Sequence, residues 1–352
     1  MADALRPRDA VLKMAPYSPP TGGRADKLRL DFNENTVGCS PRVLAALRDC
    51  LTAGGLTVYP EYGDARKELA AFFGVAPEAL LFSNGTDEAI QVLVNTYVDD
   101  GDEVLLMRPS YAMYRFYAEV AGAAVRELDY RDGDLAFPLE AFLAAIRPGT
   151  RAIVIANPNN PTGSVIDLRA IEDILQAAPG AAVLIDEAYF EFYGVTALPL
   201  LDRYPNLFVS RTFSKVYGMA AMRMGCLFSR PANIAYLRKA QSPYSVNALA
   251  VMAAREAIRD TGYIENYVAE VHAARGLLRA GLDELKIPYF ASEANFILMR
   301  IGPRAIEVRD RLREKGVLVR DRSYEIEGSV RVTVGTREQV RRFLRELKEI
   351  WK

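Results

Sequence analysis

The stretch "RTFSKVYGMAAMRMG", residues 211–225, places one lysine, Lys215, between a serine and a run of apolar residues. The only other charged side chains in this stretch are those of Arg211 and Arg223. Lys215 can be a surface residue beside a buried turn. It can also be a partly desolvated amine that acts as a nucleophile, since burial lowers the pKa of an ammonium group. The rest of the chain has to decide between these interpretations.

The composition is that of an ordinary globular protein without a strong charge bias. The 352 residues include 44 basic and 45 acidic side chains, and 50% of the residues are hydrophobic. This balance gives no basic footprint for nucleic acid and no attraction to an anionic membrane surface. The length predicts one large domain or two moderate ones.

Three cysteines and a single histidine, His272, give little support to a disulfide framework, a zinc site or a Ser-His-Asp triad. The first residues contain no apolar segment of the kind found in signal peptides. No run of residues is apolar enough to span a membrane. We therefore expect a soluble, cytoplasmic protein without a metal site.

Short apolar runs alternate with helical patterns through the middle of the chain. The expected strands lie at 102–107, 123–128, 151–156, 181–186, 206–211 and 222–229. The expected helices lie at 86–98, 110–121, 138–147, 167–177 and 231–240. Buried strands separated by helices predict an α/β fold, with a mostly parallel central sheet covered by helices on both faces.

The two ends of the chain follow other patterns. Residues 1–30 are rich in Pro, Gly and Arg and are expected to form an extended arm. After about residue 245 we expect helices at 245–259 and 262–285, then strand 295–301, helix 303–315, strands 316–320 and 329–336, and helix 336–350. We predict an arm over 1–30, a large domain over 31–255, and a smaller α+β domain over 256–352 that the arm joins.

Four motifs follow predicted strands, where open α/β sheets bind their ligands. In "SNGTDEAIQVLVN", Gly85, Thr86 and Asp87 precede a helix, and backbone N–H groups with a hydroxyl suit an anion. An ordinary helix cap explains the same residues. In "IANPNNPTG", residues 155–163, closely spaced asparagines and prolines predict a rigid turn, which is either a plain connection or part of a site.

The other two motifs carry charge. In "VLIDEAYFEF", Asp186 and Glu187 end an apolar strand, so at least one carboxylate is expected to be partly buried and to need a cationic partner. That partner is either a distant Arg or Lys or a ligand. Lys215 is surrounded by hydroxyl and guanidinium groups that suit a phosphate, those of Arg211, Thr212, Ser214 and Arg223.

A lysine, a phosphate cradle and a buried carboxylate together indicate one cofactor. Pyridoxal 5'-phosphate has an aldehyde for the lysine, a phosphate for the cradle and a ring nitrogen for the carboxylate. These residues therefore favour the interpretation of Lys215 as a nucleophile.

The order of "NPNNPTG", "DEAYFEF", "RTFSKVYGMAAMRMG" and "VRVTVGT" resembles that of the fold-type I, class I/II aminotransferases, and among them the histidinol-phosphate aminotransferases. Supporting segments are "LDFNEN", "VYPEYGD", "SNGTDEA", "RPSYAMY", "SPYSVN" and "EANFIL". The resemblance covers residues 15 to 340 or so. It implies a pyridoxal phosphate-dependent transaminase of histidine biosynthesis, which converts histidinol phosphate and 2-oxoglutarate to imidazole-acetol phosphate and glutamate.

The resemblance also implies roles in cofactor binding. Lys215 matches the Schiff-base lysine that then moves the proton, and Asp186 matches the aspartate paired with the pyridine N–H. The remaining matches are Tyr189 and Asn160 at the cofactor's 3-oxygen, Tyr111 stacked on the ring, and Gly85, Thr86, Asp87, Thr212, Ser214 and Arg223 at the phosphate. Tyr59 matches a tyrosine that reaches the neighbouring subunit's cofactor, which implies a homodimer with shared active sites.

The substrate is less well determined by the resemblance. Arg331 matches an arginine that grips the substrate's distal anion, and an arginine fork suits either a carboxylate or a phosphate. Tyr17 matches an arm tyrosine of the same pocket. Further donors could come from Asn33, Tyr244, Asn247 and Arg320. Arg322 and Tyr324 could instead shape the pocket for an aromatic amino acid, as in the related aromatic aminotransferases.

Two further functions stay open at this point. A lyase of the threonine-phosphate decarboxylase type shares these motifs and a phosphorylated ligand. A non-enzymatic pyridoxal phosphate-binding domain of a regulator usually follows a DNA-binding helix-turn-helix, and residues 1–30 are too short and too rich in Pro and Gly for one.

Overall fold

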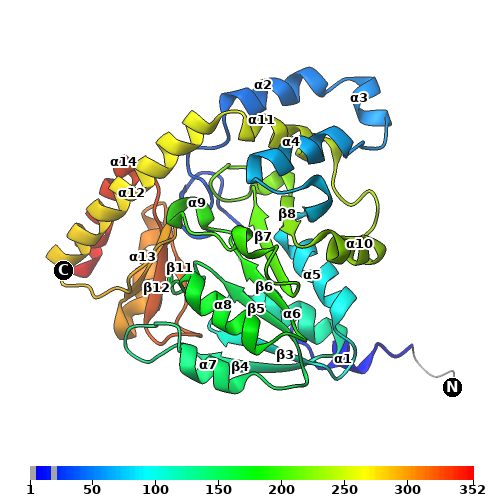
Figure 1. Cartoon of the computed structure of the whole chain (residues 1–352). Coiled ribbons are helices and arrows are strands. Elements are labelled where there is room, and N and C mark those ends of the chain that lie inside the picture. The colour runs from blue at the N-terminus through cyan, green and yellow to red at the C-terminus, as the bar shows by residue number, and fades with distance from the viewer. Residues whose placement is uncertain (1–4, 17–21) are drawn as a thin grey trace.

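The computed structural model describes residues 5–16 and 22–352, and its centre is a seven-stranded sheet (Figure 1). The strands are β2 Leu80–Asn84, β3 Glu103–Arg108, β4 Ala124–Asp129, β5 Thr150–Ala156, β6 Ala182–Asp186, β7 Leu207–Thr212 and β8 Met224–Phe228. Their order is β2-β8-β7-β6-β5-β3-β4, and β8 alone runs against the others. The expected mostly parallel sheet is confirmed, and β2 is a strand that the sequence analysis missed.

Apart from the edge strand β4, the strands are buried on both faces, because successive side chains point into different cores. On β6, Val183 and Ile185 belong to one apolar cluster, and Ala182 and Leu184 belong to the other. The first cluster also contains buried residues of α4, α8 and α11, and the second those of α5, α6 and α10. Near-continuous apolar strands are therefore required here, as in other sheets covered on both sides.

The helices expected between the strands are all present. They are α5 Gly85–Tyr97, α6 Ala112–Ala121, α7 Leu139–Ala145, α8 Leu168–Ala177, α10 Pro231–Ala240 and α11 Ala248–Ile258. Before the sheet lie α1 Asp9–Leu12, β1 Leu28–Arg29, α2 Pro41–Cys50, α3 Ala53–Thr57 and α4 Gly63–Phe73. Short helical turns are α9 Phe190–Tyr193, η1 Pro77–Ala79, η2 Leu198–Leu200, η3 Ala220–Met222 and η4 Gly302–Arg304. None of the helices within the described ranges is long and apolar enough to cross a membrane.

The C-terminal third forms a separate layer, seen at the left of Figure 1. Its elements are α12 Thr261–Glu284, β9 Phe296–Arg300, α13 Ala305–Glu314, β10 Val317–Leu318, β11 Arg320–Asp321, β12 Ser329–Thr333 and α14 Arg337–Trp351. β11, β12 and β9 form an antiparallel sheet, whereas β10 pairs with β1 of the arm. The single strand expected at 316–320 is thus two short strands, each serving a different sheet.

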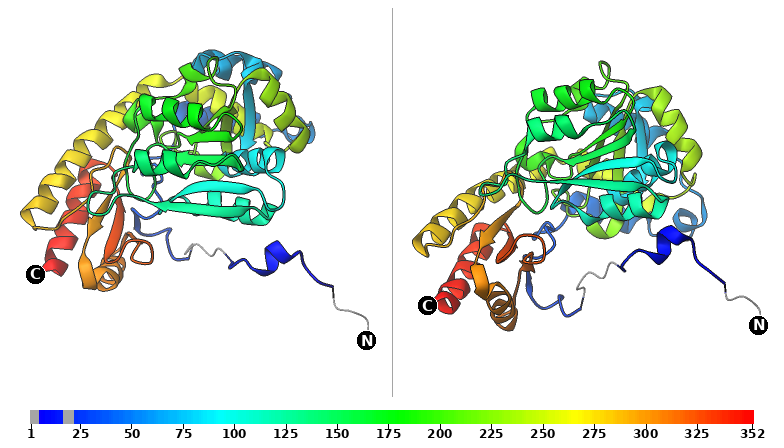
Figure 2. Two further views of the ribbon diagram at one scale, coloured as in Figure 1. Left: turned by 60° about the horizontal axis from the view of Figure 1, so that its bottom comes forward. Right: turned by 90° about the horizontal axis from the view of Figure 1, so that it is seen from below.

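The C-terminal end of the arm joins this layer. β1 pairs in parallel with β10, and α1 lies beside α6, while residues 5–8 lead into α1 away from the C-terminal layer (Figure 2). We keep the boundary near residue 255 between a large and a small domain as a proposal. It is supported by α12, which begins beside the central layer and runs along α14.

All the sheet's parallel strands, β2 included, end at the same edge. β8 is antiparallel to both β7 and β2, so β2 runs in the same direction as β7. The motifs that follow β2, β3, β5, β6 and β7 therefore meet at one edge of the sheet. This is where open α/β sheets place their ligand sites.

The packing of α14 generates a stability prediction. Leu347 of α14 is 0% exposed, whereas Ile306 of α13 is 54% exposed. We expect Leu347→Ala to lower the free energy of unfolding by about 2–5 kcal/mol, because the truncation leaves a cavity. Ile306→Ala should cost less than about 1 kcal/mol. Urea unfolding followed by circular dichroism measures both, and equal losses for the two variants would contradict the packing described.

Candidate active site

A cavity of about 410 Å³ opens at the carboxyl edge of the sheet. Residues 32–34, which directly follow the arm, line it together with segments of the large layer and the C-terminal layer. The sequence-predicted residues that it brings together are Asn33, Thr86, Asp87, Tyr111, Asn160, Asp186, Tyr189, Thr212, Ser214, Lys215, Arg223, Arg320 and Arg331. Residues that are distant in sequence, from 33 to 331, thus share one site.

Lys215 faces this cavity from a loop whose apolar neighbours point inward. Phe213 and Val216 are buried in the core, and Gly218 closes the turn by donating its N–H to the Lys215 carbonyl at 3.1 Å. The Lys215 Nζ donates to the Phe32 carbonyl at 3.0 Å. The alternation of a polar and an apolar side of the loop explains why one lysine stands among apolar residues.

Asp186 is a buried carboxylate at the end of β6. The Tyr114 hydroxyl donates to its Oδ2 at 2.6 Å, and the Ser210 hydroxyl donates to its Oδ1 at 2.8 Å. Burial raises the pKa of Asp186, and these two hydrogen bonds only partly offset that effect. Within the described residues it forms no ion pair. A buried carboxylate without an ion pair is stabilised by a cationic N–H donor, which a ligand can supply.

The start of α5 is suited to an anion. The N-cap residue Asn84 makes no side-chain capping hydrogen bond, so it does not satisfy the first N–H groups of the helix. Gly85 has a φ of 71°, and a Cβ there would lie 2.4 Å from Nη2 of Arg223. Glycine at 85 therefore lets the Arg223 guanidinium lie against the start of α5, although Gly85 itself does not line the cavity.

Asp87 connects two further groups of the cavity. Its Oδ2 accepts a hydrogen bond from Arg223 at 3.0 Å, and its Oδ1 accepts one from the Tyr111 hydroxyl at 2.8 Å. These bonds fix the guanidinium and the aromatic ring relative to the start of α5. Thr212 and Ser214 border the same end, and the Thr212 hydroxyl accepts the Ser214 backbone N–H at 3.0 Å.

A strap of three consecutive residues, 31–33, closes the cavity from the arm side. The carbonyl of Asp31 accepts from Arg331 at 2.6 Å, and the carbonyl of Phe32 accepts from Lys215 at 3.0 Å. Asn33 donates its amide to the Tyr189 hydroxyl at 3.0 Å. Each residue of the strap therefore holds a different side chain of the site.

Arg24 ties this strap down. Its guanidinium forms ion pairs with Asp31 at 2.9 Å and Glu34 at 2.8 Å, and it stacks on the Phe32 ring at 4.2 Å from the centroid. Arg320 lies 5.5 Å from the same ring centroid. Sequence reasoning missed Arg24, Phe32, Tyr114 and Ser210, because their contacts join segments that have no fixed spacing in the chain.

Three arginines crowd the end of the cavity formed by the C-terminal layer. Arg331 is buried, and burial together with Arg322 and Arg320 lowers its pKa to about 10, which still leaves it protonated at neutral pH. Arg331 also donates to the side-chain oxygen of Asn160. Arg322 pairs with Glu325 at 2.5 Å and donates to the Tyr324 hydroxyl at 2.8 Å.

Several predicted residues lie elsewhere. Tyr59 and Tyr244 stack on each other at 4.5 Å, and neither lines the cavity of this chain. Asn247 caps α11 by accepting the Ala250 N–H at 2.8 Å. Tyr17, the expected arm tyrosine, lies outside the described residues.

The expectation that Arg211 lies with the phosphate-binding groups around Lys215 is wrong. Arg211 does not join these groups, because its side chain points to the other face and pairs with Glu187 at 2.7 Å. In the motif "VLIDEAYFEF", Glu187 is therefore the carboxylate that pairs with a distant arginine. Asp186 has no cationic partner among the described residues, so a ligand can supply one.

A lysine amine that faces the cavity, a helix start without a side-chain cap beside an arginine, and a buried carboxylate with no cation among the described residues fit the aldehyde, the phosphate and the ring nitrogen of pyridoxal phosphate. On this fold, the three together define a pyridoxal phosphate enzyme of fold type I. The fit rests on charges and donors of the described residues.

Comparison with known proteins agrees with this class. The model of the family "Aminotransferase class I and II" matches residues 25–347. A histidinol-phosphate aminotransferase of Symbiobacterium thermophilum is 39% identical over 97% of both chains. The structure of a histidinol-phosphate aminotransferase from Sinorhizobium meliloti in complex with pyridoxal-5'-phosphate has a TM-score of 0.89 at 25% identity, and the match covers 99% of this chain and 98% of that chain.

A Thermus thermophilus aspartate aminotransferase with maleate has a TM-score of 0.81 at 25% identity, over 92% of each chain. The chain described here belongs to the aminotransferase class I and II family. It is a pyridoxal phosphate-dependent transaminase, as the sequence analysis expected.

The strap generates a prediction about Arg24. Arg24→Ala removes both ion pairs of the strap and should raise the KM for the amino donor roughly tenfold, equivalent to about 1.4 kcal/mol, with a smaller change in kcat. The reason is that the Asp31 carbonyl no longer fixes Arg331. Steady-state kinetics checks this.

Arg6→Ala is the matched control for Arg24, since it breaks an exposed arm ion pair with Asp9 and should leave KM within about twofold of the parent value. Arg24→Lys keeps the charge but not the fork, so its KM should be intermediate. An unchanged KM in a folded Arg24→Ala protein would show that the strap does not position Arg331 for the amino donor.

Proposed function

We propose that this transaminase transfers the amino group of histidinol phosphate to 2-oxoglutarate, giving imidazole-acetol phosphate and glutamate in histidine biosynthesis. The relatives named histidinol-phosphate aminotransferase, at 33–39% identity, support this substrate. Among the residues of the cavity, the charge around Arg331 carries the proposal.

The C-terminal end of the cavity carries more positive charge than a carboxylate needs. Of the described carboxylates that line this end, Glu325 pairs with Arg322 and Glu34 pairs with Arg24, so Arg320 and Arg331 leave an excess of two positive charges. A phosphate monoester carries about −1.5 to −2 at neutral pH, so it matches this excess better than a carboxylate does. Among the described residues, Nε of Arg322 and Nε of Arg331 are buried without a hydrogen-bond partner, and a multidentate anion would supply acceptors there.

The role that we propose for each residue in the reaction follows from its position in the cavity. Pyridoxal phosphate, when bound, supplies an aldehyde that accepts the amino group and a ring that withdraws electrons. We propose that Lys215 takes and returns the proton at its Nζ, and that Asp186 keeps a proton on the ring nitrogen. Burial and the hydrogen bonds from Tyr114 and Ser210 hold the Asp186 carboxylate in place for that role.

The other residues bind and orient. Thr86, Ser214 and Arg223 are proposed to hold the cofactor's phosphate, with Gly85, Asp87 and Thr212 shaping that end. Tyr189 and Asn160 are proposed to hold the 3-oxygen, and Tyr111 the ring face. Asn33 orients the Tyr189 hydroxyl, which its amide contacts at 3.0 Å.

We further propose a cytoplasmic homodimer in which Tyr59 serves the neighbouring subunit's site. The support is the position of Tyr59: it is 72% exposed, stacks on Tyr244, and lies outside its own chain's cavity. The substrate contacts of Tyr17, Tyr244 and Asn247 stay predictions.

The role of Lys215 generates a prediction. Lys215→Ala should lower turnover by at least about 10²- to 10⁴-fold, the usual contribution of a general base, and should remove the visible absorbance due to attachment of the cofactor. Lys239→Ala, which removes an exposed lysine of α10, should do neither. Full turnover by the Lys215→Ala protein would refute the proposed mechanism.

The charge excess generates a prediction about the donor. We expect the apparent second-order rate constant to be roughly a hundredfold higher for L-histidinol phosphate than for L-phenylalanine. Single-turnover absorbance measurements on the cofactor-loaded protein give this constant for each donor. About 2.7 kcal/mol from hydrogen bonds between arginines and phosphate is sufficient for this ratio.

A preference for phenylalanine would make the protein an aromatic amino-acid aminotransferase, with Arg331 holding a carboxylate. Release of carbon dioxide from L-threonine phosphate, without amino transfer to 2-oxoglutarate, would make it a lyase of the decarboxylase type. Either result would overturn the proposed donor and leave the family membership unaffected.

A further inference from the structure

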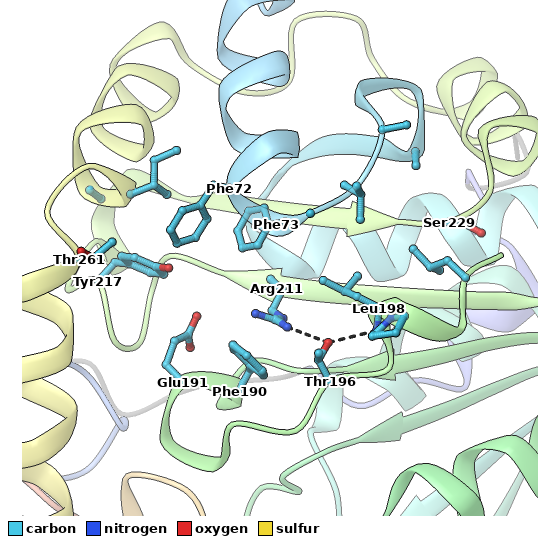
Figure 3. Close-up of a pocket in the computed structure, with 18 of the residues that line it drawn as sticks. Phe72, Phe73, Phe190, Glu191, Thr196, Leu198, Arg211, Tyr217, Ser229 and Thr261 are labelled. Carbon is cyan, nitrogen blue, oxygen red and sulfur yellow. Dashed lines mark hydrogen bonds between the residues drawn. The ribbon is translucent and has the colours of Figure 1, made fainter. Parts of the chain in front are cut away.

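A second cavity, of about 730 Å³, lies against the other side of the active-site segments (Figure 3). Its volume is in the range of small-molecule sites and exceeds that of the active-site cavity. The two cavities share no lining residue. Three segments nevertheless border both, since Phe190 and Glu191 follow Tyr189, Arg211 precedes Thr212, and Tyr217 follows Lys215.

The walls of this cavity are largely aromatic and aliphatic. Phe72 and Phe73, from the end of α4, lie across from Phe190, with Tyr217 at one end and Leu198 at the other (Figure 3). Flat aromatic walls suit a planar, apolar ligand. They also attract a cation, because the faces of aromatic rings carry partial negative charge.

Two polar groups in the cavity have no side-chain hydrogen-bond partner among the described residues. The Tyr217 side chain is 4% exposed, and its hydroxyl points into the cavity (Figure 3) without a hydrogen bond to any residue of the described ranges. Glu191 accepts a hydrogen bond from its own backbone N–H but forms no ion pair within those ranges. The two groups interact electrostatically, since Glu191 contributes to raising the pKa of Tyr217.

The described basic residues of the lining form no ion pair with Glu191, although the charge of Arg211 partly offsets the effect of burial on its pKa. The Arg211 guanidinium is already paired with Glu187 at 2.7 Å, donates to Thr196 at 2.9 Å, and is covered by the Phe190 ring at 3.3 Å from the centroid. Arg230 donates to the backbone carbonyls of residues 201 and 202. Burial raises the pKa of Glu191 to about 7, and no cation among the described residues pairs with it, so a single positive charge bound beside it would stabilise the carboxylate.

We propose that this cavity is a binding site for a small aromatic monocation with N–H donors, such as an amidinium, imidazolium or ammonium group on a ring. The N–H groups would donate to Glu191 and to the Tyr217 hydroxyl, and the ring would pack against Phe72, because the Arg211 guanidinium already lies on the Phe190 ring. Such a ligand contacts the reverse side of the segments that carry Tyr189, Thr212 and Lys215. The site is separate from the proposed donor chemistry and does not depend on it.

The test is isothermal titration of the cofactor-loaded protein with benzamidine. Benzamidine is a planar aromatic monocation, and its protonated nitrogens are poor nucleophiles toward the cofactor's aldehyde. We expect saturable binding of one molecule per chain. Benzamide, its neutral counterpart of the same shape, should show no saturable binding. The same affinity in the presence of saturating 2-oxoglutarate would place the probe outside the active site.

Variants of the lining residues test whether benzamidine binds in this cavity. Glu191→Gln should weaken benzamidine binding at least roughly tenfold, because it removes the charge but not the volume. Tyr217→Phe removes only the hydroxyl and should weaken binding roughly threefold, which keeps the test informative if the first variant does not fold. Glu265→Gln, at an exposed carboxylate of the rim, should change affinity by less than about twofold. Absence of saturable binding, equal affinity in Glu191→Gln, or displacement by 2-oxoglutarate would overturn the proposal.

Discussion

A buried negative charge at the centre of the sheet, the carboxylate of Asp186, is the constraint on which the site depends. The protein supplies it with hydroxyl donors from Tyr114 and Ser210 but with no cation among the described residues. Such a group is costly unless a ligand brings a positive N–H. We propose that the ring nitrogen of the cofactor, when bound, supplies this positive N–H at the end of β6. The neighbouring segments then place a lysine and an anion site within reach of the same ligand.

Strand alternation separates the residues that face the active-site cavity from the residues that hold their segments. Asp186 and Thr212 face the active-site cavity, whereas their neighbours Glu187 and Arg211 form a buried ion pair on the other side. That pair links β6 and β7, so it keeps the strand ends that carry Asp186 and Thr212 in register. The same alternation creates the second cavity, whose walls are the reverse sides of the catalytic segments.

The sequence determined the class of fold and most of the cofactor site. Apolar runs alternating with helical patterns predicted the parallel sheet, because strands covered on both faces have to be apolar throughout. β2 was missed because its last two residues, Ser83 and Asn84, are polar and its run is short. The motifs around Asp186 and Lys215 predicted the cofactor because their chemistry is local: each motif follows a strand, and parallel strands end at one edge.

The tertiary structure alone decided the contacts between segments that are far apart in the chain. The sequence shows that Arg211 and Arg223 flank Lys215, but only the direction of each side chain assigns Arg223 to the cavity and Arg211 to Glu187. The same holds for the strap, where Arg24 and Arg331 reach residues 31–33 from opposite ends of the chain. Pattern and spacing report on neighbours within a few residues, whereas charge pairing across the fold depends on how the layers pack.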